Sequence, residues 1–473
     1  MENYKKEFIK FLLDVDALHV GGDFTLKSKR ISPWFVNVGD FNDGNSISAL
    51  GRFYAEALIN SEENFDILYG IPEKGNALVV ATAIALAEKE KNIPWFFTRK
   101  TPKKYGEASE LPEEDKKIKE LVIGRVPKNG QIIAQLDDVF TAGDAKYEAR
   151  KTLQSIGNFE LPALVIAVDR QEVGVDGKSA IKEYEAQTGT KVISIVNASE
   201  IYQFLKEREI FPLEKINRMS NYLRLYGPDA VKNVVGKLEQ KIIDSDRSVI
   251  PACDVETLEK FELLIKQTAN IKGIGGYKIG FELGLNYGLP KVVEVARNLT
   301  DKPLIYDHQK AGTDIPDTGK NFAKVVKKAG VDAVILFPQA GPETERAWIY
   351  HALDNGLKVI VGGRMTHPAY TVSEGGFITD EGALEIYRIA ARAGINDFVV
   401  PGNKPEVIKK IREVVETEGA DPIFYAPGFI AQGGSISDSA KVAGDKFHGI
   451  VGRGIYEKSD MRQAAIEHTS QLN

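Results

Sequence analysis

Short apolar runs alternate with amphipathic helical patterns along the whole chain, and this alternation predicts its fold. In the first half, strand-like runs occur at residues 65–69, 94–98, 131–136, 163–168 and 192–196, with helical patterns between them. Alternating strands and helices indicate a mainly parallel sheet covered by helices. Ligands of such sheets bind beyond the carboxyl ends of the strands.

From Ser248 onward the same alternation repeats eight times. The apolar runs are residues 249–253, 277–281, 304–306, 333–337, 359–361, 398–400, 423–425 and 450–451. The helical patterns between them, such as 256–267 and 320–328, carry apolar residues at three- and four-residue spacing. Eight consecutive strand–helix units predict a (β/α)8 barrel.

The two halves meet in a charged, helical stretch at residues 211–246, which Gly227-Pro228 interrupts. We therefore expect an α/β chain with one domain at 1–227 and a second at 228–473. The 473 residues exceed what one ordinary core holds. The joining stretch is not a Gly/Ser-rich flexible tether.

Composition narrows the class of protein. The net charge of -6 gives no general attraction to nucleic acid or to an anionic membrane. No apolar stretch reaches transmembrane length, and the first residues have no apolar signal core. A single cysteine, Cys253, excludes an internal disulfide and fits a reducing cytoplasm. The six histidines lack metal-ligand spacing, which argues against zinc held by the protein.

Residues 304–316 carry the densest candidate chemistry. An apolar run ends in Asp307, and Lys310 and Asp314 follow, while Gly312 and Pro316 argue against a continuing helix. A surface ion pair between Lys310 and Asp314 is the plain alternative. Charges at the carboxyl end of a barrel strand, however, are typical of a barrel active site.

Other barrel strands also end in polar residues, and these should converge on one rim. The set is Asp254, Lys278, Asp307, Lys310, Thr366, Gln432 and Arg453. Each alone fits a salt bridge or a solvated loop, but seven on one rim favour a binding site. The glycines after Gln432 and around Arg453, including Gly452, predict the phosphate site that barrels place near strands seven and eight. Arg453 suits bidentate phosphate contact.

In the first half, the loops after the strands carry cations. Lys74 lies in a glycine-containing loop after the first strand, where backbone N–H groups could hold a phosphate. Arg99, Lys100, Lys103 and Lys104 follow the second strand. Four cations so close together repel one another until an anion neutralises them, although the run alone would also suit a solvated loop.

The third strand ends in two adjacent acids, Asp137 and Asp138. Such acids can accept two ribose hydroxyls. The small residues that follow, Thr141, Ala142 and Gly143, let backbone N–H groups at a helix start close around a phosphate.

With this two-acid, Thr-Ala-Gly pattern, the chain resembles the phosphoribosyltransferases that use phosphoribosyl pyrophosphate. Residues 26–28, 32–33, 99–107 and 168–172 narrow the resemblance to orotate phosphoribosyltransferases, over about residues 1–227. It implies a type I phosphoribosyltransferase domain and a dimer, because in that family the basic loop reaches into the neighbouring subunit's site. It also implies Mg²⁺ carried by phosphoribosyl pyrophosphate, with no direct protein ligand.

The resemblance implies a role for each candidate residue. The ribose would be held by Asp137 and Asp138, and the 5-phosphate by Thr141, Ala142, Gly143, Asp144 and Ala145. Pyrophosphate would contact Lys74, Arg99, Lys100 and the catalytic Lys103, next to Tyr105. Orotate would face Lys27, Phe35 and Arg170.

Three positions depart from that family's pattern. Asp144 stands where Thr or Ser is usual and adds a negative charge beside the expected phosphate. Lys29 replaces a usual Gly, and Glu73 replaces a usual neutral residue. Lys29 could compensate the added acids.

The second half resembles orotidine 5′-monophosphate decarboxylases over nearly its whole length. The matching segments are 252–254, 278–280, 314–316, 365–368, 426–428, 432–434 and 450–453. The family's usual spacing is Asp-x-Lys-x-x-Asp, whereas here one residue is added on each side of Lys310, so the loop must bulge.

This second resemblance implies that Lys310 donates a proton to the carbon that loses CO2. Asp307, Asp314 and Lys278 would complete the charged site, with Asp314 entering the neighbouring subunit's site. Substrate contacts are implied for Asp254, Thr366, Gln432, Gly452 and Arg453. No cofactor is implied for the decarboxylase.

Together the two resemblances imply consecutive reactions: orotate and phosphoribosyl pyrophosphate give orotidine 5′-monophosphate, which then loses CO2 to give uridine monophosphate. We expect a cytoplasmic homodimer or larger assembly acting on these small molecules, with no nucleic-acid or membrane partner. Two alternatives remain open. One is a sugar-phosphate decarboxylase or aldolase barrel, which would use Mg²⁺. The other is a regulatory sensor of phosphoribosyl pyrophosphate, with Asp144 as its only support.

Overall fold

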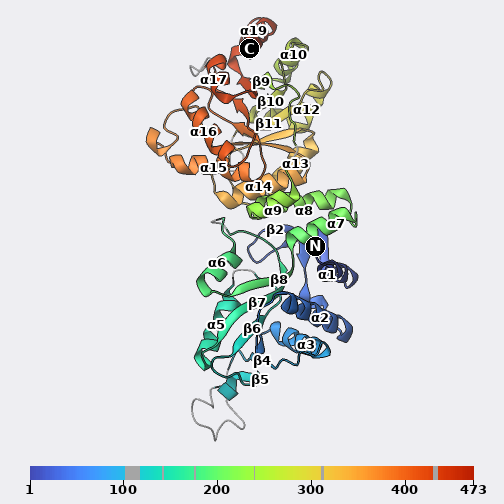
Figure 1. Ribbon diagram of the computed structural model, residues 1–473. Coiled ribbons are helices and arrows are strands. Elements are labelled where there is room, and N and C mark those ends of the chain that lie inside the picture. The colour runs from blue at the N-terminus through green and yellow to red at the C-terminus, as the bar shows by residue number, and fades with distance from the viewer. Residues whose placement is uncertain are drawn as a thin grey trace. The chain divides into compact units, whose positions relative to one another are not determined.

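The computed structural model describes residues 1–101, 118–140, 143–174, 177–238, 240–309, 314–429 and 435–472. The chain forms two compact units, Met1–Val235 and Gly236–Asn473 (Figure 1). The short helix α9 (Asp229–Val235) therefore belongs to the first unit, although it follows Gly227-Pro228. The domain ranges 1–227 and 228–473 stay a prediction.

A six-stranded sheet forms the centre of the first unit, in the order β5-β4-β3-β6-β7-β8. Its strands are β3 (Ile67–Gly70), β4 (Trp95–Thr98), β5 (Val122–Gly124), β6 (Ile132–Leu136), β7 (Glu160–Asp169) and β8 (Lys191–Asn197). All neighbours are parallel except β5, which runs antiparallel to β4. The predicted mainly parallel sheet is confirmed.

An antiparallel hairpin of β1 (Leu18–Thr25) and β2 (Ile31–Val36) stands apart from this sheet and was not predicted. The helices of the unit are α1 (Asn3–Asp14), α2 (Gly44–Asn60), α3 (Gly75–Glu88), α5 (Asp144–Ile156), α6 (Ala180–Thr188), α7 (Ala198–Glu207), α8 (Leu213–Tyr226) and α9, with a 3-10 turn η1 (Val38–Asp40). Figure 1 shows α2 and α3 on one face of the sheet and α5 and α6 on the other.

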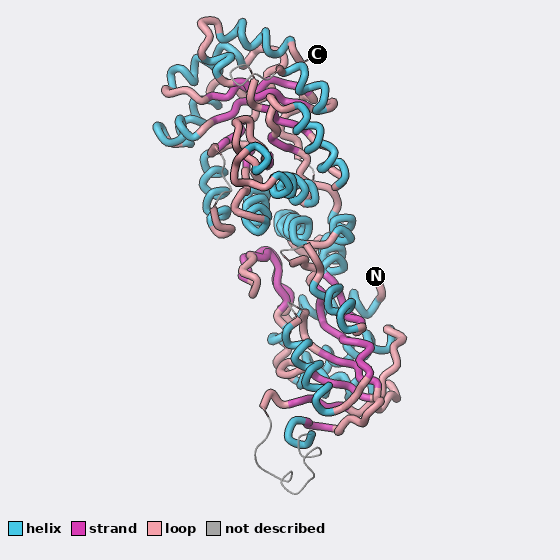
Figure 2. Tube along the Cα trace, turned by 90° about the vertical axis from the view of Figure 1, so that its left-hand side faces the viewer, coloured by secondary structure: helices cyan, strands magenta, loops and turns pink. Residues whose placement is uncertain are grey.

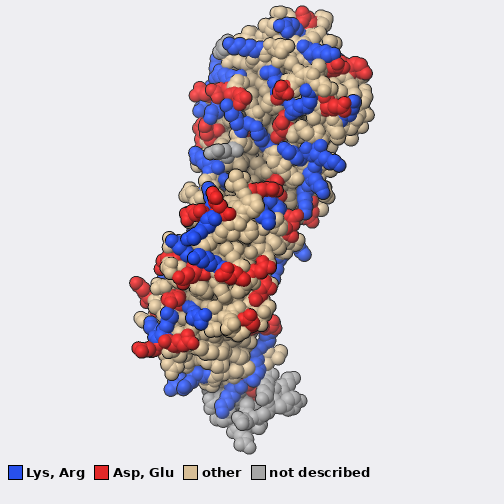
Figure 3. Space-filling view, turned by 90° about the vertical axis from the view of Figure 1, so that its right-hand side faces the viewer, with Lys and Arg blue, Asp and Glu red and all other residues tan. Residues whose placement is uncertain are grey.

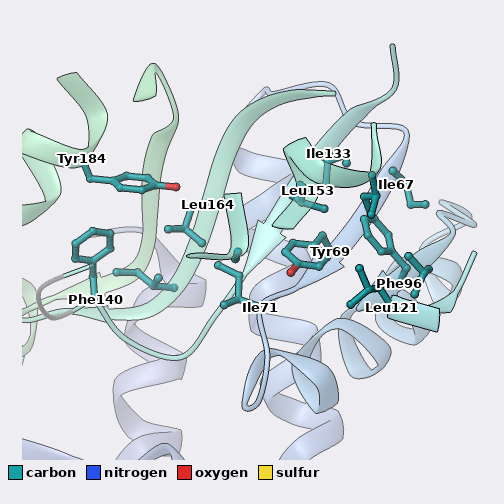
Figure 4. Packing of buried hydrophobic residues seen from close by; sticks show 14 residues of the cluster. Ile67, Tyr69, Ile71, Phe96, Leu121, Ile133, Phe140, Leu153, Leu164 and Tyr184 are labelled. Carbon is teal, nitrogen blue, oxygen red and sulfur yellow. The ribbon is translucent and has the colours of Figure 1, made fainter. Parts of the chain in front are cut away.

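Local capping explains where several of these helices begin. The Asp43 side chain accepts from the Ser46 N–H at the start of α2, and the Asn197 side chain accepts from the Glu200 N–H at the start of α7. In both cases the reciprocal bond completes a capping box. Figure 4 shows the core under α5 and α6, where Tyr69, Phe96, Ile133 and Leu164 of the sheet pack with Leu153 and Tyr184.

Eight parallel strands close the second unit into a barrel, as predicted. They are β9 (Arg247–Cys253), β10 (Tyr277–Ile279), β11 (Leu304–Asp307), β12 (Ala333–Leu336), β13 (Lys358–Gly362), β14 (Asp397–Val399), β15 (Ile423–Ala426) and β16 (Phe447–Val451). The expected strand at 277–281 ends at Ile279, because Gly280 caps a helix that starts at Phe281.

Helices surround the barrel strands (Figure 2). They are α10 (Leu258–Thr268), α11 (Phe281–Tyr287), α12 (Leu289–Arg297), α13 (Thr318–Ala329), α14 (Pro342–Asp354), α15 (Asp380–Arg392), α16 (Pro405–Thr417), α17 (Ile436–Ala443), α18 (Arg453–Tyr456) and α19 (Met461–Ser470), with a 3-10 turn η3 (Val372–Glu374). On the face drawn in Figure 3, cationic and anionic side chains are intermixed over both units.

The amino-terminal mouth of the barrel is closed by the segment before β9. Ile242 and Ile243 are buried with the inward-facing residues of the strands. Gln240 donates 2.7 Å to Asp397, the first residue of β14, and 2.9 Å to the Val359 carbonyl in β13. The barrel is therefore open to ligands from its carboxyl-terminal rim.

Candidate active sites

A cavity of about 250 Å³ lies at the carboxyl-terminal rim of the barrel. It is lined by residues that follow or end several strands, as the convergence of polar strand ends predicted. The predicted site residues among them are Asp254, Lys278, Asp307, Thr366, Gly452 and Arg453. Lys310 and Gln432 lie outside the described residues.

Lys278 is held between two carboxylates. Its ammonium lies 3.0 Å from Asp254 Oδ1 and 3.4 Å from Asp307 Oδ2, and it is 6% exposed. Burial alone would lower the pKa of Lys278, but the charges of Asp307 and Asp254 outweigh burial and raise it. Lys278 is thus a fixed cation that holds both acids at the cavity.

Strand register places this triad. Lys278 pairs with Ala252 of β9 and with Ile305 of β11, two residues before Asp254 and Asp307 respectively. Gly280 allows the close approach, because a Cβ there would lie 2.3 Å from Asp254 Oδ1. A larger residue at position 280 would displace that carboxylate.

Gly452 and Arg453 follow the last barrel strand and line the same cavity. Thr366 lines it from the segment after β13, where its carbonyl accepts 3.0 Å from the Asn403 side chain. A cavity that is lined by Arg453, Gly452 and the charged triad suits a phosphorylated ligand.

Asp314 is not among the residues that line this cavity. Its side chain is exposed and accepts 2.8 Å from the Ile315 N–H. The expectation that Asp314 enters the site of a neighbouring subunit stays a prediction, because the structure holds a single chain.

Three polar residues of the lining were missed by the sequence analysis: Gln309, Arg364 and Tyr456. Arg364 is buried and pairs with Asp380 at 2.9 Å and with Glu374 at 3.3 Å, so it braces the segment that carries Thr366. The sequence could have indicated Arg364 through its position two residues before the predicted Thr366. It could have indicated Tyr456 through its position one helical turn after the predicted Arg453.

In the first unit, the two predicted ribose-binding acids follow β6, each beside a lysine. Lys146 lies 2.6 Å from Asp137, and Lys74 lies 2.6 Å from Asp138. Burial raises the pKa of Asp137, and the charge of Lys146 opposes that rise. Lys146 is itself buried, whereas Lys74 is 61% exposed and can turn to a ligand. Lys146 was not predicted.

The expected 5-phosphate loop leads into α5. Gly143 has a φ of +86°, which favours glycine, and its carbonyl accepts 2.8 Å from the Lys146 N–H. Asp144 is the first residue of α5 and is exposed, and Ala145 follows it. Thr141 and Ala142 lie outside the described residues.

The expected pyrophosphate cations come from the loops after β3 and β4, which are adjacent parallel strands. Lys100 forms a 2.7 Å ion pair with Glu73, and both side chains are exposed. Glu73, which replaces a residue that is usually neutral in the family, is therefore the ion-pair partner of Lys100. Arg99 donates from its backbone to the Leu121 carbonyl at 2.8 Å. Lys103 and Tyr105 lie outside the described residues.

Arg170, an expected orotate contact, is held by aromatic and polar neighbours. Its guanidinium lies 4.1 Å from the Trp34 ring centre, donates 2.9 Å to Ser32 Oγ and pairs with Glu172 at 2.7 Å. Phe35 stacks on Phe24 with ring centres 5.9 Å apart. Lys27 is exposed in the turn between β1 and β2.

Two negative findings apply to the described residues. No three acidic, histidine or cysteine side chains there gather so as to hold a metal ion. Within the same ranges, no helix combines the length and apolar character needed to cross a bilayer.

Comparison with known proteins matches each half separately. Residues 247–467 match the Orotidine 5'-phosphate decarboxylase / HUMPS family. The orotate phosphoribosyltransferase of Pseudomonas fluorescens strain Pf-5 is 40% identical to this chain, over 44% of this chain and 91% of that protein. The orotate phosphoribosyltransferase of Ruthia magnifica is also 40% identical, over 48% of this chain and 100% of that protein.

Solved structures match in the same way. Orotate phosphoribosyltransferase of Francisella tularensis is 32% identical, with a TM-score of 0.40, over 47% of this chain and 99% of that one. Orotidine 5'-monophosphate decarboxylase of Methanocaldococcus jannaschii, complexed with the inhibitor BMP, is 26% identical, with a TM-score of 0.43, over 48% and 99%. The chain belongs to the orotate phosphoribosyltransferase family in its first half and carries an orotidine 5′-phosphate decarboxylase domain in its second, which makes it a fused uridine monophosphate synthase.

Proposed function

We propose that the two domains make uridine monophosphate from orotate in two consecutive steps, with the site residues acting as follows. In the first step, a bond forms between orotate nitrogen and ribose C1, and the bond from C1 to pyrophosphate breaks. Asp137 and Asp138 accept the ribose hydroxyls. Lys74 and Lys100 are exposed cations that exchange their present carboxylate partners for pyrophosphate. Arg170 faces orotate.

Mg²⁺ fits this first step as part of the substrate. Asp137, Asp138 and Glu73 are each already paired with a lysine. The described residues offer no three-ligand cluster. We propose that phosphoribosyl pyrophosphate brings the ion, which neutralises pyrophosphate charge as that group leaves.

In the second step, the carbon–carboxylate bond of orotidine 5′-monophosphate breaks and the ring carbon takes a proton. The observation that carries this assignment is the buried Lys278 between Asp254 and Asp307 at the rim cavity. A fixed charge array of this kind stabilises charge that develops on the substrate. Lys310, three residues after Asp307, supplies the proton. Gly452 and Arg453 bind the phosphate, so remote binding energy favours the transition state.

Asp314 completes the site of a neighbouring subunit in this proposal. It is exposed, lies outside the cavity lining, and is followed by Ile315, which is 59% exposed. Phe281 and Leu285 of α11 are also exposed, at 42% and 73%. Apolar side chains exposed at the barrel rim suit a two-fold interface that brings Asp314 to the partner.

The test uses purified protein with orotate, phosphoribosyl pyrophosphate and Mg²⁺, following CO2 and uridine monophosphate. Both should appear, and omission of phosphoribosyl pyrophosphate should stop both. A chelator should stop the transferase, whereas CO2 release from supplied orotidine 5′-monophosphate should continue. If the chelator also stopped that release, a metal-assisted barrel reaction would replace the proposed one.

A further inference from the structure

Gln309 lies between Asp307 and Lys310, where the spacing of this chain has one more residue than the resembling family. Its φ is +47°, in the left-handed region that non-glycine residues rarely adopt. Its backbone N–H donates 2.8 Å to Asp307 Oδ1. Its side-chain Oε1 accepts 3.1 Å from the Phe281 N–H, the first residue of α11. Gln309 therefore ties the loop after β11 to the start of the helix that follows β10.

Gln171 of the first unit also has a left-handed backbone, and it makes the corresponding bonds together with one more. Its φ is +52°, and its backbone N–H donates 2.7 Å to Asp169 Oδ1. Its side-chain Oε1 accepts 2.9 Å from the Ser199 N–H and 2.7 Å from the Ser199 hydroxyl, near the start of α7. Gln171 therefore ties the loop after β7 to the helix that follows β8.

In both units, the strand that carries the aspartate lies directly beside the strand that precedes the bridged helix. β7 runs parallel beside β8, with Asp169 opposite Asn197, and β11 runs parallel beside β10, with Tyr306 opposite Ile279. In both places an aspartate at a strand end and a glutamine two residues later bridge to the neighbouring strand's helix. In the first unit the bridged helix follows the next strand in sequence, β8. In the second unit it follows the previous strand, β10.

We infer that this Asp-x-Gln latch, Asp169 with Gln171 and Asp307 with Gln309, positions the substrate-facing loop of each active site. In the first domain Arg170 lies between the two latch residues, with its guanidinium over Trp34. In the second, Asp307 also pairs with Lys278, and Lys310 is the next residue after the latch. Gln171 and Gln309 are positioning residues, and their role rests on the proposed function of the two sites.

Each glutamine is the matched control for the other, because the two domains catalyse separate reactions. Gln309→Ala should lower kcat for decarboxylation about tenfold, the equivalent of one hydrogen bond, with KM changed less than about twofold and the transferase unchanged. Gln171→Ala should raise KM for orotate about tenfold through Arg170 and leave the decarboxylase unchanged. Gln463→Ala, which removes an exposed glutamine of α19 bonded to Glu467, should change neither activity.

Glycine variants separate the side chain from the backbone. Glycine adopts the left-handed conformation without strain but has no amide, so Gln309→Gly and Gln171→Gly should show the same losses as the alanine variants. Wild-type kinetics in the glycine variants, or equal loss of both activities in Gln309→Ala, would overturn the latch. Wild-type protein that released no CO2 from orotidine 5′-monophosphate would instead overturn the proposed function, so the two failures are distinguishable.

Discussion

At the scale of single residues, Lys29 shows how a departure from a family pattern acquires a physical meaning. It lies in the turn between β1 and β2 with a φ of +67°. This conformation favours glycine, which is the usual residue at this position in orotate phosphoribosyltransferases. The Lys29 N–H donates 2.9 Å to the Leu26 carbonyl, so the turn fixes that conformation. The departure therefore carries backbone strain in addition to a charge.

Replacing Lys29 with glycine should stabilise the first domain by up to about 1 kcal/mol, because glycine adopts the left-handed region without a Cβ clash. The measurement is the thermal midpoint for loss of transferase activity, together with KM for phosphoribosyl pyrophosphate. A raised midpoint with a raised KM would mean that the lysine binds substrate at the expense of stability. A lowered midpoint would contradict the strain argument.

Asp397 is a buried acid at the closed mouth of the barrel. Burial raises its pKa to about 6, although the Tyr425 hydroxyl and the Gln240 amide both donate to it. Its folded pKa therefore lies above the unfolded value, so the folded state binds its proton more tightly. Stability from this group is present at low pH and is lost as pH rises toward and through about 6, by about 3 kcal/mol in total.

Asp397→Asn should remove this dependence. The stability of the variant relative to wild type should improve between pH 4.5 and pH 7.5, measured as the urea midpoint for loss of decarboxylase activity. Burial lowers the pKa of His448 to about 3, which favours higher pH in both proteins and cancels in the comparison. A difference between variant and wild type that stays constant with pH would show that Asp397 is ionised throughout.

At the scale of elements, the sequence predicts strands well and the contacts between their loops poorly. The eight barrel runs give eight strands because buried strands between amphipathic helices leave an unambiguous pattern. The β1–β2 hairpin was missed because Gly21-Gly22 interrupts β1. The short strand β5 was also not predicted.

Among the site residues, too, positions along strands were predictable and contacts between elements were not. The polar strand ends were predictable because parallel strands bring their carboxyl ends to one edge. The Lys146–Asp137 pair and the Gln309 latch were not, because each depends on how a side chain from one element reaches another. No spacing rule in one sequence specifies those contacts.

Helix α5 supplies a cation, Lys146, to Asp137, one of the two acids proposed to bind ribose. Lys146 also donates 2.7 Å to the Val139 carbonyl, so it fixes the segment that carries both acids. Lys146→Met should leave Asp137 buried without its counter-charge and raise the pKa of that carboxyl further. Transferase kcat/KM for phosphoribosyl pyrophosphate should then fall most at low pH, where Asp137 would be protonated.

The measurement for Lys146→Met is the pH profile of that kcat/KM between pH 6 and 9, with decarboxylation as the control for intact protein. An acid limb shifted to higher pH supports the assignment. A uniform loss at every pH would assign Lys146 a structural role alone. The domain itself should lose about 3 kcal/mol or more of stability, because one partner of a buried ion pair has been removed.

At the scale of the whole molecule, the two activities should be separable by mutation and yet both depend on a second copy of the chain. Lys310→Ala should stop decarboxylation while transfer continues, so that orotidine 5′-monophosphate accumulates. The second dependence belongs to the proposal that Asp314, which is exposed and outside the cavity lining, completes the partner's site.

Coexpression of two inactive chains tests that assembly. Lys310→Ala and Asp314→Ala should each lack decarboxylase activity, but a mixed dimer contains one site with both residues intact and one with neither, by two-fold symmetry. Random assortment makes half of the dimers mixed, so about a quarter of normal sites should return. Differently tagged chains identify the mixed dimers, and the transferase activity of each preparation shows that both chains fold. Verified mixed dimers without decarboxylase activity would place Asp314 in its own chain's site.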